Sequence, residues 1–463
     1  MAHYHFIGIG GTGLSAIARV LFERGEMVSG SDITNSQIAK ELKELGMDIQ
    51  VGHKKSNIKN PDMVIRSSAI SDTNPEVIAA RKKNIPVLKR RDFLGQLTQK
   101  QKVIAISGTH GKTTTTAMIS WMLHECEFDP SYVIGSISKN LGRNAAAGNG
   151  DYFVIEADEY DNMFLGLSPD ILVITNIEHD HPDCFPTEKD YLFAFHQLTK
   201  KIIPGGYLIA CADNAGVKNL LHSLAEKLEV VTYGTSKDVD LQIIALNHIR
   251  GKGIRFKIRN NTNRLDLPEK VELSIKVPGD HNACNATAAL AIGAILKAKT
   301  SKAIDALSSF TGTGRRFDII GNANGITFID DYGHHPTEIK TTLTATRHQY
   351  PDKNIWAVWQ PHTYSRTQEL FDAFVNSFSE CDHIIVTEIY RAREPQQAYS
   401  SRILVNALSH PDKHYIETLS ETESYLKKNL SRGDILIIFS AGDANTISKN
   451  LLDWFNTFGS TND

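Results

Sequence analysis

One segment of the sequence combines residue types and spacing that suit the binding of a triphosphate. Residues 107–113, Ser-Gly-Thr-His-Gly-Lys-Thr, follow an apolar stretch and precede a helical pattern. In such a loop, backbone N–H groups surround the phosphates, the lysine reaches the terminal phosphates and the hydroxyl binds Mg²⁺. The strict form of the motif has glycine where this chain has Ile106, so the segment predicts a shorter relative of that loop. The predicted nucleotide contacts are Gly108, Thr109, His110, Gly111, Lys112, Thr113 and Thr114.

Acidic residues follow the next two predicted strands. Residues 156–159, Glu-Ala-Asp-Glu, end one strand, and residues 175–181, Thr-Asn-Ile-Glu-His-Asp-His, end another. A hard cation prefers carboxylate oxygens, so acids at strand ends near a phosphate loop predict a Mg²⁺ site. The alternative is that both segments are solvated acidic loops. Their shared position after apolar strands favours the metal site.

A glycine-rich turn near the amino terminus predicts a second anion site. Gly8-Ile9-Gly10-Gly11-Thr12-Gly13 follows the first strand and opens the first helix, and Asp32 ends the second strand. Glycines let the backbone approach a diphosphate, and an acid at that distance can bind a ribose hydroxyl. The pattern does not separate NAD from another nucleotide diphosphate, so an NAD-dependent oxidoreductase is one interpretation. A tight turn without any ligand is the structural alternative.

Polar groups also follow strands in the second half of the chain. Residues 279–286, 330–336 and 360–367 each combine His, Asn, Asp or Arg near the start of a predicted helix. In parallel α/β sheets, ligands bind outside the carboxyl ends of the strands. Asn282 and Asn285 could bind adenine or cap a helix. The pair Arg315-Arg316 has an ordinary exposed basic pair as its alternative.

Alternation of short apolar runs with helical patterns predicts an α/β protein of three domains. We expect a Rossmann-like domain at residues 1–98 and a central P-loop ATPase domain at 99–312. The central domain should have a parallel sheet with antiparallel hairpins at 239–277. A Rossmann-like domain should follow at 313–463. The polar stretch 97–102 and Gly312-Thr313-Gly314 mark the boundaries.

Composition excludes several classes of partner. The 463 residues are 41% apolar and 22% charged with a formal charge of -3, which gives no bulk attraction to nucleic acid or an anionic membrane. The amino-terminal segment lacks a signal-peptide pattern, and no apolar run has the length of a membrane span. The five cysteines are widely spaced without Cys-x-x-Cys, which fits a reducing cytoplasm. Monomer and dimer both remain open.

With these motifs in this order, the sequence resembles the Mur ligase family over nearly its whole length. The resemblance includes Gly-Thr-His-Gly-Lys-Thr at 108–113, His-Asn-x-x-Asn-Ala at 281–286, Asp-Asp-Tyr-Gly-His-His-Pro at 330–336 and Gln-Pro-His at 360–362. It implies a UDP-substrate domain, an ATPase domain and an amino-acid domain, in that order. It also implies that the first glycine turn holds UDP-N-acetylmuramate rather than NAD.

The implied reaction uses ATP and Mg²⁺ to phosphorylate the muramoyl carboxylate, after which the amine of L-alanine attacks the acyl phosphate. The implied ATP contacts include Lys112, Asn282, Asn285, Arg316 and Asp331, and the implied metal ligands are Thr113, Glu156, Glu159 and His181. The UDP substrate would contact Gly10, Gly11, Thr12, Gly13, Asp32, Ser67 and Ser68. The predicted catalytic residues are Lys112, His334, His335, His362 and Arg366.

Three points stay open at the level of sequence. The incoming amine must be neutral to attack, and His334, His335 and His362 are all candidates for the base. A relative that attaches a preformed tripeptide to the same muramate substrate is the alternative within the family, and a non-catalytic nucleotide-binding regulator is another. The sequence departs from the family pattern at Arg66, at residues 396–399 and at Ser440.

Overall fold

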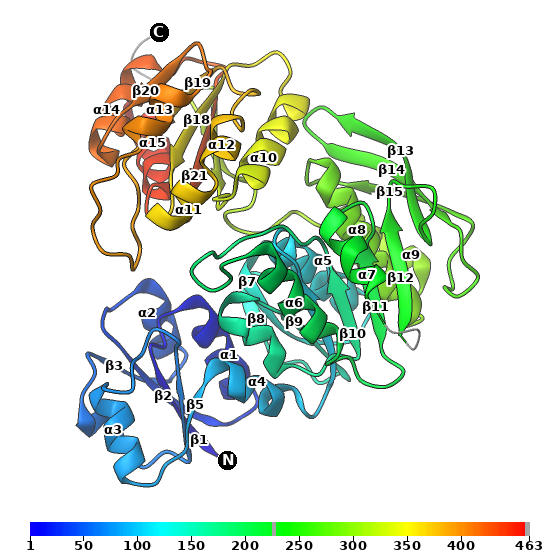
Figure 1. Cartoon of the computed structure of the whole chain (residues 1–463), viewed down its shortest axis with the longest axis vertical. Helices are drawn as coiled ribbons and strands as arrows, with labels where there is room; N and C mark the ends of the chain where they lie inside the picture. The colour runs from blue at the N-terminus through cyan, green and yellow to red at the C-terminus, as the bar shows by residue number, and fades with distance from the viewer. Residues whose placement is uncertain (225–227, 459–463) are drawn as a thin grey trace.

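A computed structural model describes residues 1–224 and 228–458 and folds them into three α/β domains, each on its own sheet (Figure 1). The predicted fold class is therefore confirmed. The boundaries proposed after residues 98 and 312 remain predictions, and they fall between sheets. Within the described residues, no helix is long and apolar enough to cross a membrane.

The first domain is a parallel sheet with an apolar cluster on each face. Phe6 belongs to one cluster and Ile7 to the other, because successive strand residues point to opposite faces. The sheet order is β3-β2-β1-β4-β5. Its strands are β1 (His3–Ile7), β2 (Met27–Asp32), β3 (Asp48–Val51), β4 (Met63–Arg66) and β5 (Val87–Lys89). Its helices are α1 (Thr12–Glu23), α2 (Gln37–Glu44), η1 (Lys55–Asn57), α3 (Pro75–Lys82) and α4 (Arg90–Thr98).

The central domain joins a parallel core to antiparallel strands at both edges. Its order is β15-β14-β13-β12-β11-β10-β6-β9-β7-β8, in which β13, β14 and β15 form the predicted hairpins. The strands are β6 (Lys102–Ser107), β7 (Ser131–Ser138), β8 (Arg143–Ala146), β9 (Tyr152–Glu156), β10 (Ile171–Ile174), β11 (Tyr207–Cys211), β12 (Glu229–Gly234), β13 (Leu241–Ile249), β14 (Gly253–Asn260) and β15 (Lys270–Ile275). The helices are α5 (Lys112–Glu125), η2 (Tyr160–Gly166), α6 (Glu188–Thr199), α7 (Ala215–His222), α8 (Asp280–Ile295) and α9 (Thr300–Ser309).

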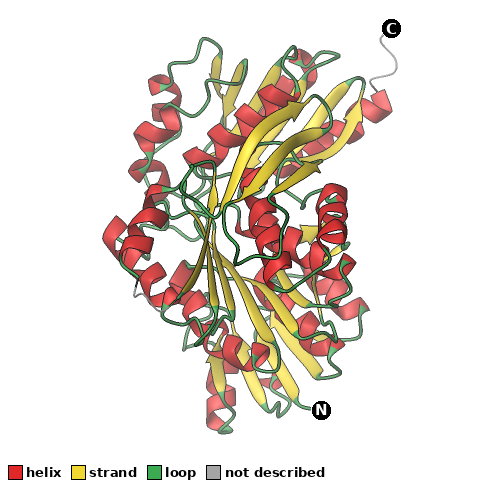
Figure 2. Cartoon of the chain, turned by 90° about the vertical axis from the view of Figure 1, so that its right-hand side faces the viewer, coloured by secondary structure: helices red, strands yellow, loops and turns green. Residues whose placement is uncertain are grey.

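The third domain has the sheet order β16-β17-β21-β18-β19-β20, parallel except for the antiparallel edge strand β16. The strands are β16 (Asp318–Ala323), β17 (Ile326–Asp331), β18 (Ile355–Gln360), β19 (His383–Val386), β20 (Lys413–Tyr415) and β21 (Ile435–Ser440). The helices are α10 (Pro336–Gln349), α11 (Tyr364–Glu369), α12 (Phe371–Val375), α13 (Arg402–Ala407), α14 (Leu419–Asn429) and α15 (Asn445–Phe458). Figure 2 shows helices on both sides of the strands.

In Figure 1 the third domain lies above the first domain, with the central domain on the right, and the segment between β19 and α13 extends toward α2 of the first domain. The guanidinium of Arg24 joins the first domain to the central one by donating to Gln101 at 2.6 Å, and it also donates to the carbonyl of Leu97 in its own domain at 2.7 Å. Arg143 adds an ion pair to Glu23 at 3.0 Å. Thr12 and Gly13 of the amino-terminal glycine turn line the same cavity as Lys112 of the phosphate loop.

The sequence predicts a polar break at residues 97–102, and the structure differs at the start of this stretch. Leu97 and Thr98 form the last turn of α4, and both are buried. The connection to β6 is therefore only a short turn. The helix extends further than its polar composition suggests because Leu94 and Leu97 pack into the apolar core shared with the central domain.

A buried carboxylate organises the far side of the first sheet. Glu76, fully buried at the start of α3, accepts hydrogen bonds from Ser31 at 2.6 Å, Asn57 at 2.6 Å and the backbone N–H of Lys54 at 3.0 Å. His5 lies 3.2 Å away. Burial alone would raise the pKa of Glu76, but hydrogen bonds from His5, Ser31 and Asn57 bring it below its ordinary value. The carboxylate therefore stays charged.

We expect Glu76→Ala to lower the free energy of unfolding by about 3 kcal/mol, because several buried donors lose their acceptor. Chemical denaturation followed by circular dichroism measures the change. Glu44→Ala, an exposed position on α2, is the matched control. An equal effect of both substitutions would contradict the structural role of the buried network.

Candidate active site

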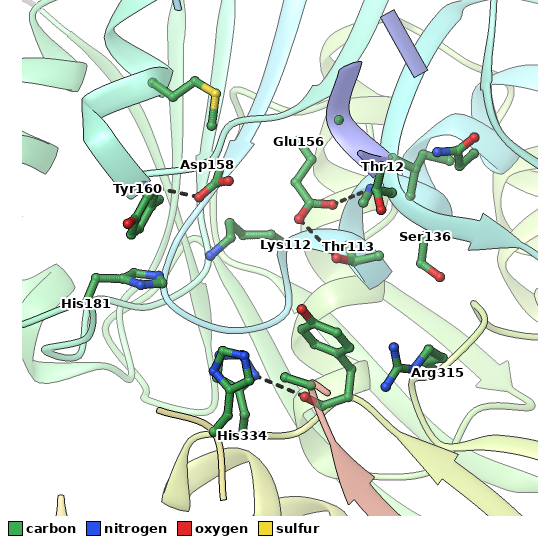
Figure 3. A pocket seen from close by; sticks show the side chains of 18 of the residues that line it. Thr12, Lys112, Thr113, Ser136, Glu156, Asp158, Tyr160, His181, Arg315 and His334 are labelled. Carbon is green, nitrogen blue, oxygen red and sulfur yellow. Dashed lines mark hydrogen bonds between the residues drawn. The ribbon is translucent and has the colours of Figure 1, made fainter. Parts of the chain in front are cut away.

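A cavity of about 950 Å³ lies where the three domains meet. The first domain contributes Thr12 and Gly13, and the central domain contributes Lys112, Thr113 and Glu156. The third domain contributes His334, which Figure 3 shows opposite Lys112 and His181, together with His362 and Arg366. The structure thus brings together predicted site residues as distant in sequence as Thr12, a predicted substrate contact, and Arg366, a predicted catalytic residue. We call this space the large cavity.

The phosphate loop connects β6 to α5 and needs glycine at its first turn. Gly108 has a φ of +136°, and a Cβ there would lie 2.1 Å from Oγ1 of Thr175. The loop also holds Lys112 tightly. Its Nζ donates to the carbonyl of Gly108 at 2.6 Å and lies 2.9 Å from the carboxylate of Glu159. An ammonium group at a helix N-terminus is well placed to bind an anion.

Glu156, Glu159, Thr113 and His181 lie around the loop as a donor set suited to a hard divalent cation. The hydroxyl of Thr113 donates to Oε1 of Glu156 at 3.0 Å, and His181 lies 3.6 Å from Glu159. Burial raises the pKa of Glu156. Burial would also raise the pKa of Glu159, but Lys112 and His181 outweigh it and lower the pKa to about 2. Oxygen donors predominate, so the set fits Mg²⁺.

A smaller cavity of about 340 Å³ lies on the other side of the phosphate loop. It is lined by Asn282 and Asn285 of α8 and by Asp331 of β17. The amide of Asn282 donates to the carbonyl of Pro278 at 2.6 Å, and that of Asn285 donates to Oδ1 of Asn282 at 3.0 Å. Neither side chain caps α8, whose first turn lacks a side-chain cap. The capping alternative is therefore wrong.

The two cavities share part of their walls. Gly111 and Thr113 of the loop line both, as do Arg316 and Glu338 of the third domain. Arg316 donates to Oε1 of Glu338 at 3.1 Å. A molecule filling the smaller cavity can therefore present one end to the large cavity across the phosphate loop.

The three candidate histidines differ in their positions. His334 and His362 line the large cavity, whereas His335 lines neither cavity. His335 caps α10, because its Nδ1 accepts the backbone N–H of Thr337 at 3.3 Å. Burial lowers the pKa of His334 to about 3 and those of His335 and His362 to about 4, so all three are neutral near pH 7.

Hydrogen bonds also distinguish His334 from His362, the two histidines that line the large cavity. Nδ1 of His334 lies 3.0 Å from the carbonyl of Tyr332, which assigns a proton to Nδ1 and leaves Nε2 as an acceptor. Nδ1 of His362 lies 3.3 Å from Nη1 of Arg366, so it accepts and Nε2 carries the proton. His334 is therefore the better placed of the two to accept a proton through Nε2.

A buried ion pair joins the third domain to the central one. Arg366 donates to Oδ1 of Asp180 from Nε at 2.9 Å and from Nη2 at 2.8 Å, and both side chains are buried. The pKa of Asp180 lies far below its ordinary value, since Arg366 and neighbouring histidines outweigh the effect of burial. This pair holds Arg366 at the wall of the large cavity.

His110 of the phosphate loop makes a second link between these domains. Its Nε2 lies 3.2 Å from Glu178 of the central domain, and its Nδ1 lies 3.3 Å from Glu338 of α10. Burial would lower the pKa of His110, but the two carboxylates outweigh it and raise the pKa to about 9. His110 is therefore a cation near pH 7.

The predicted UDP-substrate residues are only partly in the large cavity. Thr12 and Gly13 line it, but Gly10, Gly11, Asp32, Ser67 and Ser68 are outside its described lining. Oδ2 of Asp32 accepts the backbone N–H of Gly10 at 2.9 Å, so the acid supports the glycine turn itself. The unusual Arg66 pairs with Asp72 at 2.8 Å and donates to the carbonyl of Ile70 at 2.7 Å, which fixes the loop after β4.

Arg90 and Glu338 are among the charged residues of the cavity wall that the sequence did not indicate. Arg90, at the start of α4, lies 3.6 Å from Asp158 and would collide with a Cβ at position 13, which explains the glycine there. Glu338 accepts from Arg316 and from the backbone N–H of His334 at 3.0 Å. The spacing His-Pro-x-Glu at 335–338 is a helix-capping pattern that could have indicated Glu338.

The chain belongs to the Mur ligase family. The profile described as Mur ligase family, catalytic domain, matches residues 3–102, that of the Mur ligase middle domain matches 106–293, and that of the Mur ligase, glutamate ligase domain matches 315–442.

The curated relatives and one solved structure share a name, and a second solved structure carries another. The UDP-N-acetylmuramate–L-alanine ligase of Desulforamulus reducens is 42% identical over 97% of this chain and 96% of its own. The enzyme of that name from Clostridium acetobutylicum is 42% identical over 97% of each chain. The crystal structure of the UDP-N-acetylmuramate-alanine ligase of Thermotoga maritima superposes with a TM-score of 0.82 at 29% identity, covering 99% of this chain and 100% of its own. A murein peptide ligase from Psychrobacter arcticus gives 0.73 at 25% identity, covering 99% of each.

The raised pKa of His110 predicts a pH dependence. Its ion pairs are fully formed below the ordinary histidine pKa of 6.5 and are lost as the pH rises through about 9. We expect stability to fall over this window by on the order of 2 kcal/mol, and His110→Gln to flatten the change. Thermal unfolding between pH 6 and pH 10 measures it. His222→Gln, an exposed histidine, is the control, and an unchanged profile for His110→Gln would contradict the prediction.

Proposed function

We propose that this chain is an ATP-dependent ligase that joins L-alanine to the carboxylate of UDP-N-acetylmuramate through an acyl phosphate. The observation that carries the proposal is the position of the phosphate loop between two cavities that share Gly111, Thr113, Arg316 and Glu338. A phosphoryl group can pass from one cavity to the other only at such a junction. The relatives described above carry the name of this reaction.

ATP occupies the smaller cavity in this proposal. Asn282 and Asn285 face adenine, and Asp331 lies on the same wall. The triphosphate follows the loop toward Lys112 and Thr113, where the backbone N–H groups at the start of α5 point at its oxygens. Arg316 reaches the same junction from the third domain and neutralises the transferring phosphoryl group.

Thr113, Glu156, Glu159 and His181 would hold Mg²⁺ here. When bound, the ion neutralises phosphate charge and lets the carboxylate approach. The ammonium group of Lys112, which lies beside Glu159 in the wall of the large cavity, also neutralises phosphate charge. Carboxylate and triphosphate repel each other, so these cations must act together before in-line transfer.

UDP-N-acetylmuramate occupies the large cavity, with its diphosphate near Gly13 and Arg90 of the first domain. Its carboxylate would reach the phosphate loop, because Lys112 and Thr113 line the same space. The guanidinium of Arg90 is placed where it can bind a diphosphate oxygen. The sequence alone did not indicate this residue. The cavity excludes water from the acyl phosphate once the third domain covers it.

L-alanine binds at the third-domain wall, where Arg366 suits its carboxylate and His334 suits its amine. His334 keeps its proton on Nδ1 and accepts the ammonium proton through Nε2. Burial gives His334 a low pKa of about 3, and the anionic substrates in the cavity raise its basicity. The neutral amine attacks the acyl carbon, and inorganic phosphate leaves.

The decisive measurement is release of phosphate from ATP with UDP-N-acetylmuramate, comparing L-alanine, glycine, L-serine and the tripeptide of the recycling reaction. We expect release that depends on L-alanine, with a product mass equal to the amide. Release with the tripeptide alone would assign the chain to the recycling reaction. Nucleotide binding without any release would favour a non-catalytic regulator.

We expect Lys112→Ala to reduce turnover by about 10³-fold while leaving UDP-substrate binding little changed, because the lysine contacts phosphate and not uridine. Calorimetric titration of the UDP substrate and a coupled ADP assay separate the two effects. Lys100→Ala, on the exposed turn after α4, is the control. Equal loss of binding and turnover would contradict separate sites.

We expect His334→Ala to spare acyl-phosphate formation but to slow amide formation by about 10²-fold. Trapping with hydroxylamine measures the first step, and product mass measures the second. His362→Ala should mainly raise the KM for L-alanine, since its Nδ1 faces Arg366. Loss of the acyl phosphate in His334→Ala would reject its assignment as the base.

A further inference from the structure

Two cysteines meet in the smaller cavity. Cys211 ends β11 and is buried, and Cys284 lies in the second turn of α8. Their Sγ atoms and the carboxylate of Asp213 lie within 4.8 Å of one another. Both cysteines belong to the lining of the smaller cavity.

The carboxylate of Asp213 already accepts hydrogen bonds from the loop that follows β12. Oδ2 of Asp213 accepts from the backbone N–H of Thr235 at 2.6 Å and from its hydroxyl at 2.9 Å. Oδ1 accepts from the backbone N–H of Ser236 at 3.1 Å and from its hydroxyl at 2.9 Å. Four donors fill the acceptor positions of this carboxylate. The cluster is therefore better described as a pair of thiols than as a three-ligand metal site.

The surroundings of the two thiols are unequal. Cys211 accepts a hydrogen bond from the Cys284 thiol and from the backbone N–H groups of Asp213 and Asn214, which together lower the pKa of Cys211. Hydrogen bonding to Cys211 and burial raise the pKa of Cys284 well above its ordinary value. One sulfur is favoured as the thiolate, and the other keeps its proton beside it.

We propose that Cys211 and Cys284 are a paired-thiol modification site that a peroxide oxidises to an intramolecular disulfide within the nucleotide cavity. The Cys211 thiolate attacks one peroxide oxygen, the O–O bond breaks, and the hydroxide that leaves takes up a proton to form water. The Cys284 thiol then attacks the resulting sulfenic sulfur. An S–S bond forms, the S–O bond breaks, and the thiol proton leaves with the hydroxyl as a second water.

Disulfide formation would change the cavity where the nucleotide binds. The sulfurs must approach from within 4.8 Å to about 2.0 Å, which draws the start of α8 toward the end of β11. Cys284 lies between Asn282 and Asn285, the residues proposed to face adenine. The bond therefore narrows the cavity and displaces these amides. This consequence rests on the proposed nucleotide site, whereas the reactivity of the pair does not.

The test uses the full chain treated with hydrogen peroxide. The count of free thiols should fall by two from the five in the sequence, and proteolytic mass mapping should find Cys211 joined to Cys284. Binding of a non-hydrolysable ATP analogue should be lost and should return with dithiothreitol. Loss of other thiols first, or single sulfinic acids without a cross-link, would overturn the proposal.

Protection by a bound nucleotide and the behaviour of two cysteine variants provide independent tests. An ATP analogue at about 100 times its Kd should slow thiol loss by about 100-fold, since the cavity is then filled. The nucleotide affinity of Cys284→Ser should be the same before and after peroxide treatment of that variant, whereas Cys381→Ser, which removes a buried thiol of the third domain, should lose binding like the parent chain. Loss of nucleotide binding by peroxide-treated Cys284→Ser at the rate of the parent chain would overturn the proposal.

The outcomes distinguish this inference from the proposed reaction. A cross-link that forms and abolishes nucleotide binding supports the paired site even if L-alanine is not the acceptor. A cross-link that forms while nucleotide binding persists would reject the effect on the cavity. The L-alanine assay on untreated protein tests the reaction separately.

Discussion

The charge of Lys112 is the constraint on which the rest of the site depends. An ammonium placed beneath a loop and largely out of water is costly unless a carboxylate lies beside it, and Glu159 lies 2.9 Å away. Glu159 is itself buried and is shared with His181. The end of β9 and the loop after β10 must therefore both lie against the start of α5. The parallel order β10-β6-β9 brings these two strand ends to either side of the phosphate loop.

Charge also decides how the third domain meets the central one. Arg366 with Asp180, and His110 with Glu178 and Glu338, are charged groups removed from water at the contact between domains. Buried ion pairs add little net stability compared with apolar contacts, but the buried charges are compensated only when the two partners are correctly aligned. The contact thereby favours one alignment of the third domain, in which His334 and His362 face the phosphate loop.

The sequence was informative where a strand is buried on both faces and where a motif follows it. The apolar runs of β6, β10, β18 and β21 and the glycines of both turns located the fold class and the phosphate loop. Strands β3, β16 and β20 were missed because they lie at sheet edges, where few side chains are buried. The apolar strands β11 and β12 were also missed, although their residues carry the same signal. Arg90 could not be foreseen, because its role follows from the absence of a side chain at Gly13.

Glu338 shows what a shared carboxylate implies for variation among related chains. Its two oxygens accept from Arg316, from the backbone N–H groups of His334 and His335, and lie against His110. One acceptor serving several donors makes these positions energetically coupled, so double substitutions there should not add. A substitution at any one of these positions therefore requires compensating substitutions at the others. These positions are therefore expected to co-vary as a unit, while exposed residues such as 396–398 change freely.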